Sequence, residues 1–97
     1  MNNKKIYENV IIIKGEFTEE QYKKSLAKIK KNVEPFGIKE LDEKGKKKLA
    51  YSVGKNNTGY FVVLEIRATE QEILEIERYY RVNSDILKFM SVRKYRR

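Results

Sequence analysis

A β-hairpin signature at residues 45–66, GKKKLAYSVGKNNTGYFVVLEI, constrains the fold of this chain more than any other stretch. Apolar residues alternate with other residues over positions 48–53, and an aromatic and β-branched run begins at Tyr60. Residues 54–59 lie between the two runs and contain Gly and Asn, which tolerate the positive φ angles of turns. Two strands joined by this segment are therefore expected. A lone hairpin is only marginally stable in water, so the rest of the chain must pack around it.

Helix and strand patterns alternate along the rest of the chain. Thr18 with Gln21, and Thr69 with Glu72, have the spacing of a capping box, which starts a helix. Pro35 ends the first helix because it lacks a backbone N–H and restricts the residue before it. The expected elements are strands at residues 6–14, 38–53, 60–67 and 86–93, with a bulge or bend at Gly45, and helices at residues 19 to about 33 and 70–80.

The element order βαββαβ predicts an α+β, ferredoxin-like split βαβ fold. In this arrangement two right-handed crossovers place both helices on one face of a four-stranded antiparallel sheet. The other face of the sheet stays uncovered. A chain of 97 residues builds one core, so residues 1–97 are expected to form a single domain with a basic tail at 93–97.

Composition narrows the classes of function. The 22 Lys and Arg residues against 14 Asp and Glu residues give a net charge of +8, which favours a polyanionic partner over a cationic substrate. The chain has no Cys and no His, which disfavours disulfides, thiolate or imidazole catalysis and transition-metal sites. No catalytic residue, cofactor, metal or small-molecule substrate is expected. The apolar run at residues 10–13 is far shorter than a membrane span, so a cytoplasmic protein is expected. The sequence does not give the oligomeric state, and a monomer when free is the default.

Alternation along the strand at residues 60–67 separates an apolar side from a mixed side. Tyr60, Val62, Leu64 and Ile66 share the apolar side, which should face the helices because the opposite choice would bury Glu65. The mixed side should then form an uncovered apolar patch, which needs a partner. The residues predicted to contact a partner protein are Phe61, Val63 and Glu65 on this strand and Val10 and Ile12 on the first strand. Stacking of RNA bases on the same face is the second interpretation.

Basic residues mark the candidate RNA contacts. Lys46 and Lys48 share one side of their strand, where they bind phosphates or, alternatively, only protect an edge strand from aggregation. Lys88 points away from Phe89 and is a similar candidate. The other basic candidates lie at the end of the chain and are Arg93, Lys94, Arg96 and Arg97. Tyr7 and Tyr51 are also candidates, as core residues or as residues that stack on RNA.

The sequence resembles the family of the bacterial small-subunit ribosomal protein six. The resemblance lies in GKKKLAYSV at residues 45–53 followed by Gly59 and Tyr60, in Tyr7 and Glu8, and in NSDILK at residues 83–88. It implies a structural component of the platform of the small ribosomal subunit that pairs with small-subunit ribosomal protein eighteen and binds a junction in the central domain of the ribosomal RNA. The departures are Val53 in place of Ile, Lys88 in place of Arg, and Lys14, Gly15 and Glu16 in place of a Pro-containing turn.

Two alternatives of other classes remain open, a general single-stranded RNA-binding module and a ferredoxin-like domain that senses a small ligand. An RNA-stacking platform should expose several aromatic residues on its central strands, and Phe61 alone clearly qualifies. An enzyme is disfavoured. A small phosphatase of this fold would need an anion-cradling loop with an Arg after the first strand, and residues 14–17 offer neither.

Overall fold

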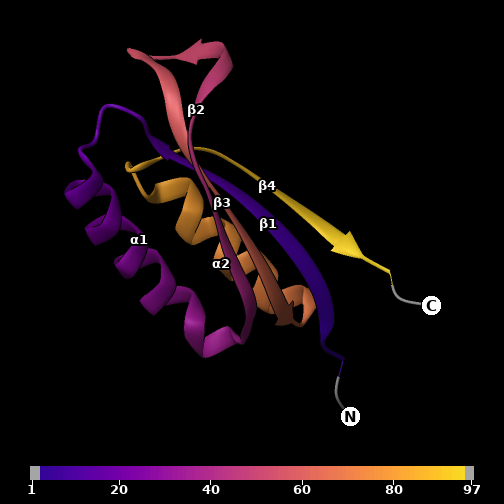
Figure 1. Ribbon diagram of the computed structural model, residues 1–97. Coiled ribbons are helices and arrows are strands. Elements are labelled where there is room, and N and C mark those ends of the chain that lie inside the picture. The colour runs from indigo at the N-terminus through magenta and orange to yellow at the C-terminus, as the bar shows by residue number, and fades with distance from the viewer. Residues whose placement is uncertain (1–2, 96–97) are drawn as a thin grey trace.

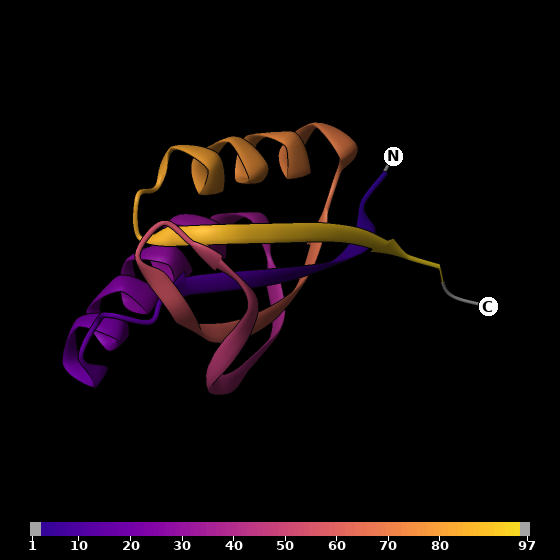
Figure 2. The same cartoon turned by 90° about the horizontal axis from the view of Figure 1, so that it is seen from above.

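The elements follow the predicted order. The computed structural model describes residues 3–95. Its elements are β1 (Lys5–Lys14), α1 (Glu19–Val33), the short 3₁₀ helix η1 (Glu34–Phe36), β2 (Ile38–Val53), β3 (Asn56–Ala68), α2 (Glu70–Val82) and β4 (Ile86–Lys94), as drawn in Figure 1. The antiparallel strands form one sheet in the order β2-β3-β1-β4. Both helices cover one face of this sheet, which confirms the predicted ferredoxin-like fold (Figures 1 and 2).

Both helices begin where the capping boxes predict. The Thr18 hydroxyl accepts a hydrogen bond from the Gln21 backbone N–H, and the Gln21 side chain accepts one from the Thr18 N–H. Thr69 and Glu72 form the same reciprocal pair at the start of α2. These bonds satisfy backbone donors that a helix start would otherwise leave free.

Neither helix within residues 3–95 is long and apolar enough to cross a membrane.

The core lies between the helices and the helix side of the sheet. Alternate residues of β3 from Tyr60 to Ala68 are buried there, which confirms the predicted division of this strand. β1 contributes its odd-numbered residues from Tyr7 to Ile13. The apolar helix faces complete the core with Tyr22, Leu26, Ile29 and Val33 from α1 and Ile73, Ile76 and Tyr80 from α2.

One buried polar chain connects three elements through this core. The Tyr80 hydroxyl of α2 donates to Asn9 Oδ1 at 2.8 Å, and Asn9 Nδ2 donates to Ser91 Oγ of β4 at 2.9 Å. Asn9 is fully buried, and this pairing satisfies both ends of its amide. These two hydrogen bonds fix the position of α2 relative to β1 and β4.

The hairpin differs from the prediction in the length of its connection. β3 begins at Asn56, so the link is formed by Gly54 and Lys55 rather than by residues 54–59. Asn56 pairs with Val53 in the ladder, and its side chain accepts a hydrogen bond from the Glu16 backbone N–H at 3.3 Å. These contacts hold residues 56–59 in an extended conformation. The predicted bulge at Gly45 is confirmed by a φ of +89° and a register shift in the β2–β3 pairing.

The first strand is central, as predicted, but the helices cover only one of its faces. Its nearly continuous β-branched run indicated cover on both sides. Val10 and Ile12 instead lie on the side opposite the buried odd-numbered residues and are half-buried. The apolar run therefore provides a core on one face and an unpartnered apolar surface on the other.

Candidate functional site

The sheet face opposite the helices, called the open face here, is ordered into rows by strand pairing. From β2 to β4, one row is Gly45, Phe61, Ile12 and Lys88, the next is Asp42, Val63, Val10 and Met90, and the third is Glu40, Glu65, Glu8 and Val92. All five residues predicted to contact a partner protein therefore lie together on this face. Met90 and Val92 extend the apolar surface onto β4 and are largely exposed. A contiguous apolar surface of this kind marks an interaction site.

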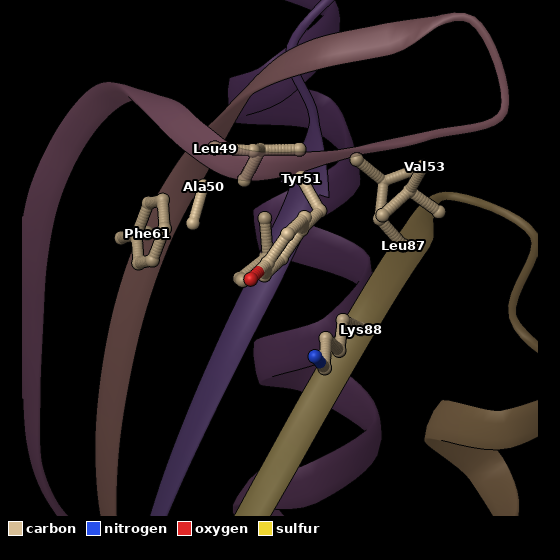
Figure 3. Close-up of a pocket in the computed structure, with 8 residues that line it drawn as sticks. Leu49, Ala50, Tyr51, Val53, Phe61, Leu87 and Lys88 are labelled. Carbon is tan, nitrogen blue, oxygen red and sulfur yellow. The ribbon is translucent and has the colours of Figure 1, made fainter.

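The end of the β2–β3 hairpin bends over one end of the open face. Residues of β2 reach across the sheet and, with residues of β1, β3 and β4, line a half-open pocket of about 220 Å³ (Figure 3). Its lining is Ile12, Leu49, Ala50, Tyr51, Val53, Phe61, Leu87 and Lys88, and we call it the apolar socket. Gly59 permits this approach, because a Cβ there would overlap the side chain of Ile12 and contact Leu49. Tyr51 is 86% exposed, so it is available to RNA or to a protein.

Acidic residues gather at the other end of the open face. A shallow pocket there is lined by Glu8, Glu40, Asp42 and Glu65 together with Lys44 and Lys94. The Lys44 ammonium lies 2.8 Å from an Asp42 carboxylate oxygen, and this hydrogen bond raises the pKa of Lys44. Lys94 lies 4.0 Å from Glu65. Within residues 3–95 no group of His, Cys, Asp or Glu side chains could hold a metal ion.

The lysines of β2 divide between the two sides of this edge strand. Lys46 pairs with Tyr60 and Lys48 with Thr58, so the two share the helix side, as alternation predicted. Lys47 points to the other side, and its ammonium lies 5.9 Å from the centre of the Phe61 ring. Lys47 was not among the residues predicted from the sequence. The position of Phe61 on the open face, together with the strand register, would have indicated it.

Lys46 lies beside a pair of stacked tyrosines. Its ammonium is 5.5 Å from the centre of the Tyr60 ring, which stacks on Tyr22 with ring centroids 4.1 Å apart. The Tyr22 hydroxyl donates a 2.6 Å hydrogen bond to a Glu43 carboxylate oxygen. Burial and this bond raise the pKa of Tyr22. The helix side of the basic edge is thus packed and does not consist only of solvated chains.

The remaining RNA candidates have different environments. Lys88 is exposed at the rim of the apolar socket, and Phe89 turns the other way to pack on Tyr80, as predicted. Arg93 is exposed and stacks its guanidinium over Tyr95 at 4.5 Å, near Lys94. Arg96 and Arg97 lie outside the described residues. Tyr7, which the sequence left open as a core or an RNA-stacking residue, lies in the core and is 7% exposed.

Comparisons with known proteins agree on one family. The family model of ribosomal protein S6 matches residues 6–93. Small ribosomal subunit protein bS6 of Sulfurovum sp. is 38% identical over 90% of this chain and 70% of its own length. The bS6 proteins of Sulfurimonas denitrificans and Clostridium novyi are 36% and 33% identical, and the matches cover 65% and 93% of their lengths.

A solved structure agrees with these sequence matches. The crystal structure of 30S ribosomal protein S6 from Thermotoga maritima superimposes with a TM-score of 0.84 at 30% identity, covering 94% of this chain and 88% of that chain. The matched residues include both helices and nearly all of the sheet. The chain therefore belongs to the ribosomal protein S6 family, whose members are structural proteins of the small ribosomal subunit and not enzymes.

Proposed function

We propose that this protein binds the central domain of small-subunit ribosomal RNA jointly with small-subunit ribosomal protein eighteen, on the ribosome in the cytoplasm. The observation that carries the proposal is the open apolar sheet face in a chain of net charge +8. Phosphates require cations, whereas the apolar face requires a protein surface. The basic residues and the apolar face therefore favour simultaneous binding of an RNA and a protein.

The RNA contacts in this proposal come from the basic edge and the C-terminal end. Lys46 and Lys48 on β2 are exposed and form none of the ion pairs found among residues 3–95. The other RNA candidates are Tyr51, Lys88, Arg93 and Lys94, together with Arg96 and Arg97 beyond the described part. The basic residues of this set would neutralise phosphates and fix the orientation of the protein without reading sequence.

The protein partner docks on the open face in this proposal. Phe61, Val63, Val10 and Ile12 form its apolar centre, and Glu65 lies at its acidic end. A general single-stranded RNA platform is less favoured, since Phe61 is the one aromatic ring that β1 and β3 place on this face. The carboxylates at one end would also repel phosphates.

The direct test measures binding of the purified protein to a central-domain fragment of small-subunit ribosomal RNA, with and without protein eighteen, at low and high salt. Tight and salt-sensitive binding that requires protein eighteen is expected. Equal affinity without protein eighteen would overturn joint binding and assign RNA recognition to the basic edge and tail alone. Absence of binding under all conditions would overturn the RNA-binding proposal.

Removing one lysine from the basic edge tests the electrostatic part of the proposal. Lys46→Ala or Lys48→Ala should weaken binding of the RNA fragment a few-fold and reduce the slope of log affinity against log salt by about one for each phosphate that is no longer neutralised. Lys30→Ala, on the outer surface of α1, is the matched control and should change neither quantity. An unchanged slope would remove that residue from the RNA site.

A further inference from the structure

Three glutamates from different strands lie side by side on the open face. Glu40 of β2 pairs with Glu65 of β3, and Glu65 pairs with Glu8 of β1, so like charges are directly opposite each other twice. We call these residues the glutamate row. Like charges in this relation destabilise a sheet. A chain with eight more positive than negative charges nevertheless places them on its one uncovered sheet face.

The protein neutralises this row only in part. Lys44 is engaged by Asp42, and Lys94 reaches Glu65 at 4.0 Å, which leaves four carboxylates against two ammonium groups in the pocket. Neither Glu8 nor Glu40 forms an ion pair within 4 Å among residues 3–95. The row therefore presents negative charge that a cation from outside can complement and that a phosphate backbone would avoid.

The opposite end of the same face has the opposite character. The apolar socket is lined mainly by aliphatic and aromatic side chains, such as Leu49 and Phe61 (Figure 3), and Ile12 belongs to the same lining. Val10, Val63 and Met90 form the row between the socket and the glutamates. Ile12 and Glu8 are four residues apart on β1, so the two ends are separated by about 14 Å at the rise of an antiparallel strand.

We propose that the open face takes a basic amphipathic segment of the protein partner in a single orientation, with an apolar side chain in the socket and an Arg or Lys side chain on the glutamate row. The proposal rests on the proposed function, because it concerns the partner assigned to this face. The two anchors of the partner lie about four residues apart in an extended segment or about nine apart in a helix. The reversed orientation would place a cation in the socket and an apolar group among carboxylates, and desolvation disfavours both.

Neutralising Glu8 and Glu40 tests whether the glutamate row binds a basic side chain of the partner. The full-length Glu8→Gln, Glu40→Gln double variant is titrated with purified small-subunit ribosomal protein eighteen in a calorimeter at low and high salt. Its affinity should fall about tenfold, with a weaker salt dependence than that of the original protein. The melting temperature of the free variant should be equal or higher, because like-charge contacts are relieved. A loss of affinity without a loss of stability is the expected signature.

A matched pair of acids elsewhere provides the control. Glu34→Gln and Glu75→Gln together change the net charge equally, at exposed positions on the helix side, and should leave the affinity unchanged. If the original protein binds protein eighteen and the Glu8, Glu40 variant binds equally well, the inference is overturned while the proposed function stands. If the original protein does not bind protein eighteen, the proposed pairing itself fails.

Cross-linking tests the orientation. The chain has no native cysteine, so a photoreactive label can be placed at Ala50→Cys in the lining of the socket or at Lys44→Cys beside the glutamate row. The label at position 50 should capture an apolar stretch of the partner, and the label at position 44 a different stretch with an Arg or Lys. Capture of the same residues from both positions, or of the basic stretch from position 50, would contradict a single orientation.

Discussion

Phe61→Glu is expected to lower the affinity for small-subunit ribosomal protein eighteen at least about a hundredfold, which corresponds to about 2.7 kcal/mol. Phe61 is half-buried, lies in the same row as Ile12 and lines the apolar socket. Buried aromatic anchors of this kind carry a large share of the binding energy of an interface. A carboxylate at this position would be desolvated by the docked partner, and the nearby Lys47 and Lys88 ammonium groups would offset that cost only in part. Calorimetric titration of the variant with protein eighteen measures the effect.

The fold should survive this change because Phe61 is outside the helix-facing core. Its neighbours Tyr60 and Val62 carry the packing against the helices, and residue 61 stays accessible to water in the free protein. Leu74→Glu is the matched control, since Leu74 is 61% exposed on α2, away from the open face. It should retain full affinity. Retained affinity in Phe61→Glu would move the interface away from the open face, whereas an equal loss in both variants would indicate a nonspecific effect.

The sequence alone predicted the element order well, because the signals for it are local. Capping boxes at Thr18 and Thr69 and alternation in β3 depend on neighbouring residues only, and the structure confirms them. The predicted start of β3 at Tyr60 was wrong, because the true start at Asn56 depends on contacts between segments that are far apart in the sequence. Asn56 and Asn57 have the composition of a turn, yet contacts with β2 and with Glu16 from the turn after β1 hold them in a strand. Such tertiary contacts override local propensity.

In the candidate site, too, the residues that a local pattern places were predicted, and those that depend on long-range contacts were not. Period-two alternation was enough to place Phe61 and Val63 opposite the core. The glutamate row depends on register between strands that are far apart in the chain, so no local pattern indicates it. The burial of Tyr7 likewise depends on how the core packs around β1. The apolar socket forms only because the hairpin bends over the sheet, and no local sequence pattern predicts that bend.

Gly15→Ala is expected to destabilise the protein by about 3 kcal/mol, because the added Cβ would overlap the backbone carbonyl and the hydroxyl of Thr58. The neighbouring atoms belong partly to the backbone of β3, so relief requires the strand or the turn to move. For a domain of this size the melting temperature should fall by roughly 12 °C or more. Thermal denaturation followed by circular dichroism measures the change. A loss below about 1 kcal/mol would show that the turn shifts at little cost.

Gly45→Ala separates this steric effect from the conformational freedom of glycine. Gly45 has a φ of +89°, but a Cβ there would meet nothing within 4 Å, so its replacement should cost only about 1 kcal/mol.

Gly15 matters to the open face as well as to stability. The turn after β1 holds the start of β3 through Gly15 and through the Glu16 bond to Asn56. The start of β3 directly follows the turn of the hairpin, and the paired end of β2 lines the apolar socket. Gly15→Ala should therefore also weaken binding of protein eighteen at temperatures where the variant is still folded.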